Sequence, residues 1–398
     1  MFRFIIFVLC YLTFVSLPLA GQAYVPFLAV EQLDAVKAKV QIDLDAKKSL
    51  LMLTRQADRI AAQPVKVSNV YGGLAQDYVC PDHGIPLSYD EKAAVHRCPK
   101  DNKQYSSEKL DAAQRFYVHM RNGRATKDLG LAYALTGDNK YAAAGRDILL
   151  QYAKNWAEYK NPNISNDHGH IFWQVLDEAQ FATNIAWGYN LIYPALTIDE
   201  QQTIENELIT PLYTMLQAKQ TADRSVNRIW ESAGSTLLGF ATNNPVWVKA
   251  AIEGPLGLKE QIAKGVSATG LWADGSLEHH NSALSALSSV AEIAPQFGYD
   301  LTTDQKLRTM FAAPLTLATP AGQPTKALAT DLYEMAYAWY KDPLFAKYLT
   351  SIYTNPAGKV DRLSYRALLY GLPLTVIPEP SSASPAVPIP VLIKNELK

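Results

Sequence analysis

The chain has 398 residues, of which 48% are hydrophobic and 19% are charged, and its formal net charge is −1. This length and composition allow one large or two ordinary domains with a sizeable hydrophobic core. Because the sequence contains no run of Lys and Arg and no basic stripe, it argues against nucleic acid as a partner.

Residues 1–23 have the three-part pattern of a secretory signal peptide. Arg3 precedes an almost unbroken apolar run, and small residues surround Ala20 and Ala23, after either of which cleavage is expected. A membrane anchor is the alternative, but the run is short for a bilayer span and the chain has no second candidate. We therefore expect a periplasmic or secreted protein with no membrane segment after cleavage.

Two cysteines remain after the signal segment, and each is framed by a histidine and a proline. They occur as Cys80-Pro-Asp-His83 and His96-Arg-Cys98-Pro, within a loop at 78–100. Two thiolates and two imidazoles match the four ligands of a structural zinc site. A Cys80–Cys98 disulfide is the competing interpretation, since an oxidising compartment favours disulfides. We expect no organic cofactor.

Helical periodicity continues almost throughout the chain, with short turns between segments. In chain order we expect helices at 30–62, 108–120, 124–135, 140–158, 172–193, 198–221, 225–242, 246–269, 281–297, 303–317, 330–340 and 343–353. We expect no strands before residue 371. This pattern predicts an all-α fold, an incomplete (α/α) toroid of helical hairpins spanning 24–371.

The last segment, 372–398, has a different composition. It is rich in proline among Ser, Ala, Val and Ile, which is typical of an extended or irregular tail. Too few residues follow the helical region to build a β-sandwich, so we expect none in this chain.

The sequence GLWADGSLEHHN at 270–281 gathers two imidazoles, two carboxylates and an indole at the start of a helix. Either His279 or His280 can exchange a proton near neutral pH, which suggests proton-transfer chemistry on a sugar. The alternative is an ordinary polar helix start capped by Asp274 or Ser276.

Several segments in this order resemble the heparinase II/III and alginate lyase superfamily. They are DLGLAYALTGDNKYA at 128–142, ILLQYA at 148–153, QVLDEA at 174–179, IEGPLGL at 252–258 and the 270–281 cluster with its helix; the Cys/His loop is similar to a loop of those lyases. The resemblance implies a toroid and an exported lyase that cleaves a uronate polysaccharide, alginate-like or glycosaminoglycan-like, by β-elimination.

The resemblance also implies site residues. Asn227 matches an Asn that neutralises the substrate carboxylate, although Asn is also a favoured helix cap. His279 stands where the family has the Tyr of a Tyr-His pair, and His280 matches the retained His. For substrate binding we expect Arg228 as a cationic donor, Trp230 as a stacking face, and Trp272, Gln174 and His170 near the toroid mouth. A solvated loop is the alternative for the segment around His170.

The chain departs from the family pattern at two points. His279 and Ser282 replace tyrosines, and relatives continue into a β-sandwich that supplies another catalytic His. A separate β-sandwich polypeptide is therefore a possible partner, in addition to an anionic polysaccharide. Two other hypotheses stay open. The first is a non-catalytic or truncated glycan-binding or assembly protein. The second is a glycoside hydrolase that uses Asp274 and Glu278.

Overall fold

The computed structural model describes residues 24–63, 65–90, 93–219, 225–273, 276–316, 329–354 and 364–371. The predicted signal segment 1–23, the Pro-rich tail 372–398 and Asp274 lie outside these residues. The helices are α1 Val30–Ile42, α2 Leu44–Ala61, α3 Glu108–Thr136, α4 Asn139–Asn155, α5 Val175–Ile192, α6 Ile198–Ile204, α7 Thr210–Ala218, α8 Val226–Ala241, α9 Pro245–Glu253, α10 Leu258–Gly265, α11 Leu277–Ala291, α12 Gln305–Thr316, α13 Thr330–Tyr340, α14 Pro343–Tyr353 and α15 Tyr365–Tyr370. The strands are β1 Ser88–Asp90, β2 Val95–Arg97 and β3 Gln104–Tyr105.

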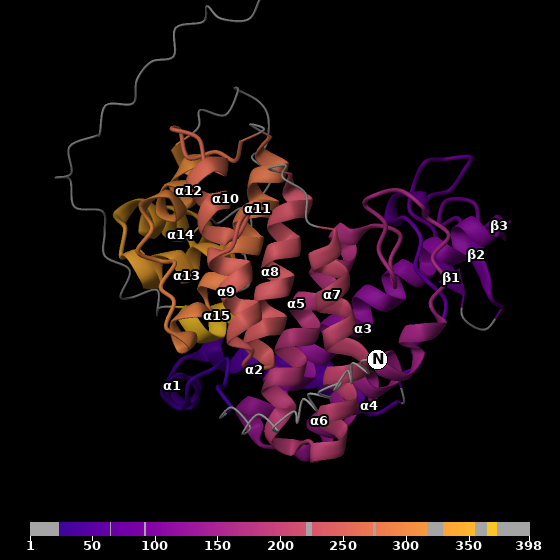
Figure 1. Ribbon diagram of the computed structural model, residues 1–398, viewed down its shortest axis with the longest axis horizontal. Coiled ribbons are helices and arrows are strands. Elements are labelled where there is room, and N and C mark those ends of the chain that lie inside the picture. The colour runs from indigo at the N-terminus through magenta and orange to yellow at the C-terminus, as the bar shows by residue number, and fades with distance from the viewer. Residues whose placement is uncertain are drawn as a thin grey trace, which may run out of the picture.

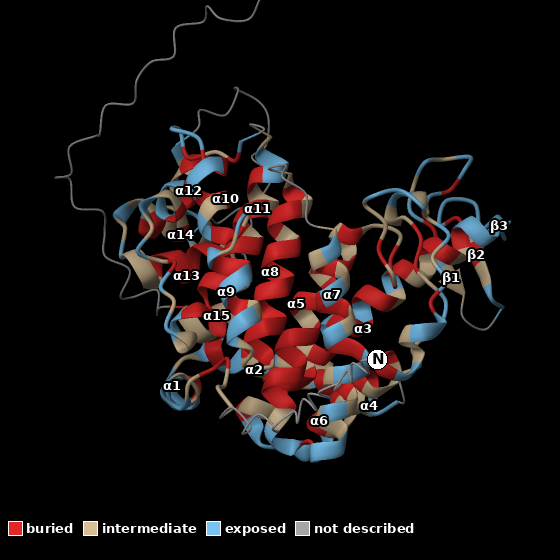
Figure 2. Cartoon of the chain, in the orientation of Figure 1, coloured by how far each residue is buried: buried red, intermediate tan, exposed pale blue. Residues whose placement is uncertain are grey.

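The helices are arranged as hairpins whose inner members stack side by side (Figure 1). Contacts run from α3 to α5, from α5 to α8 and from α8 to α11, while α4, α9 and α12 pack outside α3, α8 and α11. Figure 2 shows α5 and α8 buried along almost their whole length, as expected for inner helices. The predicted all-α, incomplete (α/α) toroid is therefore confirmed. Among the described residues, no helix combines the length and the apolarity that crossing a membrane requires.

Close approach of α3 and α5 depends on two glycines. A Cβ atom at Gly123 of α3 would stand 2.6 Å from the ring of Phe181, and one at Gly188 of α5 would stand 2.6 Å from Thr126. Both distances are well inside van der Waals contact, so a larger residue at either position would push the helices apart. This packing explains why α3 is one continuous helix, whereas the sequence predicted a break near Gly123.

The first predicted helix, in contrast, is divided. Asp43 is extended (φ −108°, ψ 116°), and its carboxylate accepts hydrogen bonds from the N–H groups of Asp45 and Ala46. An Asp that caps a new helix in this way ends the previous one. The predicted helix at 30–62 is therefore two helices, α1 and α2.

A small lobe, residues 70–107, projects beside the start of α3 (Figure 1). It contains the antiparallel sheet β1-β2-β3, in which Ser88 pairs with Arg97 and His96 pairs with Tyr105. The prediction of no strands was wrong here, because runs of two or three residues are too short to show alternation. The buried side chains of Tyr78, Cys80, Leu87 and Cys98 pack on Leu110 and Ala113 of α3. The lobe thus has its own small core, fixed to the toroid.

Candidate active site

The start of α8 presents Asn227 at the protein surface. Ser225 caps this helix, because its Oγ accepts the N–H of Arg228 at 3.3 Å. Asn227 is therefore not the cap. Its side chain is half-buried and makes no hydrogen bond to any residue that the structure describes, so its amide is available to a ligand.

Arg228 points into the protein instead. Its side chain is 1% exposed, its Nη2 donates to the carbonyl of Leu256 at 2.7 Å, and its Nη1 lies 3.7 Å from Glu231. These contacts hold the turn before α10, where Leu256 has a φ of +65°. The geometry therefore does not support the prediction that Arg228 binds substrate.

The start of α11 separates the two adjacent histidines. Ser276 caps the helix by accepting the N–H of His279 at 3.3 Å. The His279 side chain is exposed, whereas His280 is fully buried. His280 Nδ1 accepts the N–H of Trp272 at 3.1 Å, and its Nε2 donates to the carbonyl of Met310 at 3.1 Å. Burial lowers the pKa of His280, so this imidazole is neutral and both its nitrogens are occupied.

Trp272 is also a core residue. Only 1% of it is exposed, and its ring lies so close to α10 that a Cβ at Gly265 would stand 2.7 Å from it. A sugar has no access to this ring. Trp272 and His280 therefore position the turn before α11, and the predicted contacts of these two residues with substrate lack support.

Asn227 and His279 lie at the same end of two neighbouring helices. Trp230 Nε1 on α8 donates to Ser282 Oγ on α11 at 2.9 Å, and the two helices pack side by side (Figure 1). Asn227 and His279 each stand three residues, about one turn, before this hydrogen bond. The structure therefore brings together one amide and one imidazole, both accessible to solvent. Trp230 is half-buried beside them.

The loop 159–174 before α5 carries His170 and Gln174. The His170 Nε2 donates to the carbonyl of Trp156 at 2.7 Å, its ring lies 4.3 Å from the ring of Trp156, and burial lowers its pKa. Gln174 is the half-buried residue before α5, and its side chain makes no hydrogen bond within the described residues. His170 is thus a loop-fixing residue, while Gln174 remains accessible.

Glu178 anchors this loop, which the sequence analysis missed. Its fully buried carboxylate accepts the N–H groups of His170, Ile171 and Phe172, each at 2.9 Å. Burial raises its pKa to about 7, even though the three backbone hydrogen bonds act in the opposite direction. A glutamate one turn into a predicted helix, following a Gly-containing loop, was the available signal.

Lys219 at the end of α7 was also missed. Its Nζ lies 3.0 Å from His168 Nε2, and His168 Nδ1 donates to the carbonyl of Ser165 at 2.6 Å. Burial lowers the pKa of this amine. Lys219 therefore brings a cationic group to the loop 159–174 from the segment that leads into α8.

Cys80, His83 and Cys98 form a cluster in the lobe. All three ligand atoms lie within 4.8 Å of one another, and His83 Nδ1 is 3.5 Å from Cys80 Sγ and 3.4 Å from Cys98 Sγ. Sulfur and nitrogen ligands of one tetrahedral zinc stand about 3.6 Å apart, so the residues present fit this metal. Both cysteines are free thiols, and the structure contains no Cys80–Cys98 disulfide.

His96 does not belong to this cluster, contrary to the prediction. Its Nε2 donates to Asp111 on α3 at 2.8 Å, and its Nδ1 accepts the hydroxyl of Tyr78 at 3.0 Å. Cys98 directly follows strand β2, but both nitrogens of the His96 imidazole are already bound, one by Asp111 and the other by Tyr78. Asp101 Oδ2 lies 3.9 Å from His83 Nδ1, although Asp101 is not one of the three clustered ligands.

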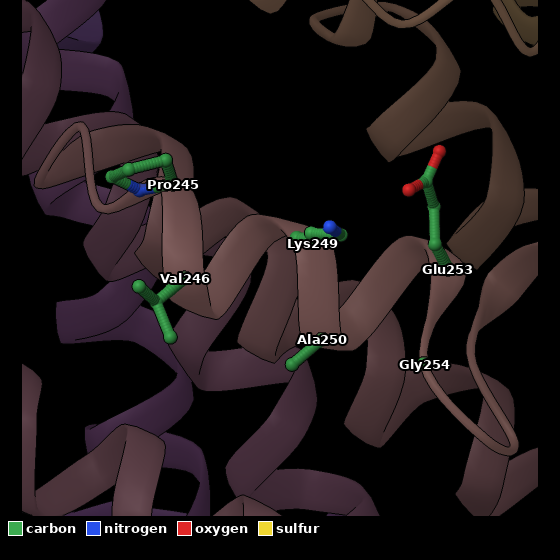
Figure 3. Close-up of a pocket in the computed structure, with 6 residues that line it drawn as sticks. All are labelled: Pro245, Val246, Lys249, Ala250, Glu253 and Gly254. Carbon is green, nitrogen blue, oxygen red and sulfur yellow. The ribbon is translucent and has the colours of Figure 1, made fainter.

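A surface hollow of about 450 Å³ runs along α9 and is separate from these groups. Figure 3 shows the residues that line it, which are Pro245, Val246, Lys249, Ala250, Glu253 and Gly254. It contains no histidine and no amide side chain. This hollow therefore lacks the groups for proton transfer, which lie at the starts of α8 and α11.

Known proteins share both sequence and fold with this chain. It is 29% identical over 167 residues to the exo-oligoalginate lyase of Saccharophagus degradans and 30% identical over 166 residues to an alginate lyase of Stenotrophomonas maltophilia. Each alignment spans 39% of this chain and only 23% and 22% of the relatives' own lengths.

Two solved structures share the fold. An alginate lyase from Bacteroides ovatus superimposes with a TM-score of 0.59 at 19% identity, over 88% of this chain and 100% of that one. Alginate lyase A1-III from Sphingomonas species A1 gives 0.51 at 16% identity, over 81% and 91%. These identities establish the fold alone. The sequence pattern of the alginate lyase family, however, matches residues 54–326, and the chain therefore belongs to the alginate lyase family.

Proposed function

We propose that this protein is a polysaccharide lyase that cleaves alginate by β-elimination. The observation that carries the proposal is the pairing of Asn227 and His279, both accessible at the same end of α8 and α11, in a toroid of the alginate lyase family. A glycosaminoglycan is the alternative uronate polymer. Export to the periplasm or medium is part of the proposal, supported by the signal pattern at 1–23.

The reaction needs three tasks from the protein. The charge on the uronate carboxylate must be offset so that the C5 proton becomes acidic, C5–H must lose its proton, and the C4 oxygen must gain one. The Asn227 amide donates to the carboxylate. His279 takes the C5 proton, the C4–O bond breaks as the C4=C5 bond forms, and His279 returns the proton to the leaving oxygen.

The test is the ultraviolet absorbance of unsaturated ends when the purified protein meets alginate. We expect a rise with the wild type and its loss in His279→Ala and Asn227→Ala. Glu278→Ala is the matched control, because Glu278 is the exposed neighbour of His279 and has no role in this mechanism. Activity that depends on Glu278 and yields reducing ends without absorbance would instead establish a hydrolase.

A non-catalytic glycan-binding protein is the second candidate. The observations that favour it are the burial of His280 and the hydrogen bond from Trp230 that engages the Ser282 hydroxyl. A single exposed imidazole then carries all proton transfer, unless a separate β-sandwich polypeptide supplies a second group. Binding of alginate with no absorbance, with and without such a partner, would support this candidate and contradict the lyase.

We further propose that Cys80, His83 and Cys98 hold one structural zinc. A zinc held by these three residues would cross-link the segments of the lobe that carry them. Metal analysis of the purified protein tests this assignment. One zinc per chain that survives in His96→Ala and is lost in Cys98→Ser is the expected result, whereas loss in both variants restores His96 as a ligand.

A further inference from the structure

A second hollow, of about 300 Å³, lies between the lobe and the loop 159–174. It is lined by Tyr71, Gly73, Leu74, Asp77, Glu108, Lys109, Ala112 and Trp173. Its volume is at the lower end of the range for ligand sites, and its combination of aromatic walls with a few polar groups is typical of them. None of the residues considered above for proton transfer or metal binding lines it.

Backbone pairing holds the two aromatic walls next to each other. Gly72 and Phe172 form a parallel bridge, in which the N–H of Gly72 donates to the carbonyl of Ile171 at 2.7 Å. Tyr71 and Trp173 flank this bridge, and their ring centroids are 6.1 Å apart. A Cβ at Gly72 would stand 2.8 Å from the backbone of Phe116, so the glycine allows the segment to lie directly on α3.

Both rings keep a polar group available. The Trp173 indole N–H and the Tyr71 hydroxyl make no hydrogen bond to any residue within the described ranges, and both side chains are half-buried. Aromatic rings with an unused polar edge can contact the apolar face of a sugar and donate to its hydroxyls. Small residues form the floor of the hollow. The N–H of Gly73 donates to the carbonyl of Ala112 at 2.7 Å, and a Cβ atom at Gly73 would stand 2.9 Å from the Cβ atom of Ala112.

Three charged residues line the hollow, which are Lys109 and the carboxylates Asp77 and Glu108. Lys109 Nζ lies 3.0 Å from Asp77, and Arg115, which donates to the carbonyl of Tyr71 at 3.0 Å, pairs with Glu108. The Lys109 ammonium retains donors beyond the one that Asp77 uses. Within this lining, Lys109 is the cationic group that can donate to a sugar carboxylate.

We propose that this hollow is a subsite for one uronate unit of the polysaccharide, outside the bond-breaking centre. The inference rests on the proposed function for the identity of the sugar. Trp173 of the loop 159–174 lines the hollow, and His168 of the same loop contacts Lys219 at the end of α7. The subsite binds the chain some units away from the cleaved bond and makes the enzyme favour longer chains.

The experiment measures oligouronate binding by calorimetry in a His279→Ala background, with di-, tri- and hexasaccharides of mannuronate or guluronate. We expect Trp173→Ala to weaken hexasaccharide binding about tenfold, the order expected for loss of one aromatic contact, and to leave the shortest ligand unaffected. Trp173→Phe keeps the ring and should lose less. Lys109→Ala tests the rim at an exposed position.

The outcomes separate this inference from the lyase assignment. If binding depends on Trp173 and on chain length but the wild type forms no unsaturated product, the subsite proposal is supported and the lyase proposal is refuted. An active wild type in which Trp173→Ala and Lys109→Ala change neither affinity nor length preference overturns the subsite alone. If neither the wild type nor any variant binds an oligouronate, the subsite proposal is overturned as well.

Discussion

Replacement of Glu178 by Gln tests how the loop 159–174 is held. The carboxylate is fully buried, and burial raises its pKa from 4.5 to about 7 in the folded protein. A raised pKa means that the folded state holds the proton more tightly than the unfolded state. The stability contributed by the protonated group is therefore complete below pH 4.5 and is lost as the pH rises to about 7.

The magnitude follows from the size of this shift. A rise from 4.5 to about 7 corresponds to a loss on the order of 3 kcal/mol in unfolding free energy across that interval. Glu178→Gln keeps an oxygen that accepts the N–H groups of His170, Ile171 and Phe172 but cannot ionise. The variant should therefore gain stability relative to the wild type as the pH rises.

Urea unfolding of the wild type and Glu178→Gln at a series of pH values measures this difference in stability. The contributions of all other titrating groups are the same in both proteins and cancel in the difference. Glu178→Ala is the companion variant. It leaves three backbone donors without an acceptor and should be less stable by several kcal/mol, at about 1–3 kcal/mol for each donor. A stability difference between Glu178→Gln and the wild type that does not change with pH would refute the reasoning.

The remaining predictions concern the proposed chemistry and the lobe. His279→Ala should lower the rate of unsaturated product formation at least about 100-fold, the usual size of a general acid–base contribution; a loss below tenfold in initial rates would exclude it as the main proton carrier. Arg228→Ala should lower the unfolding free energy by about 3–5 kcal/mol, because it removes a buried guanidinium that donates to the Leu256 carbonyl and pairs with Glu231, and should leave the KM of the folded fraction unchanged; a change confined to KM would return Arg228 to the substrate site. Chelation that removes zinc should raise proteolysis within the lobe and leave the toroid's circular dichroism intact; unchanged cleavage at 78–105 would contradict a cross-linking role.

The sequence supports the helical fold because the apolar spacing of the long segments is unambiguous. The helix ends are harder to predict, since they depend on single residues. Asp43 divides one predicted helix by capping the next, and Gly123 leaves another intact because it faces Phe181. A capping carboxylate or a helical glycine has the same appearance in the sequence whether or not the tertiary contact exists.

The candidate site was only partly predictable. Adjacent residues on a helix point about 100° apart, so His279 and His280 lie on different faces of α11. His280 lies in register with the buried Ala283, Leu284 and Leu287, and this periodicity was a signal for its burial. No comparable signal exists for Arg228, Lys219 or His96, because their orientation depends on partners distant in sequence, such as Asp111 for His96.

Mass spectrometry of the products from alginate tests the central claim most directly. The account predicts oligosaccharides that carry an unsaturated uronate at the new non-reducing end, each lighter by one water than the hydrolysis product, and predicts that they disappear in His279→Ala but persist in Glu278→Ala. Products of full hydrolytic mass, or unsaturated products that form equally well without His279, would contradict it.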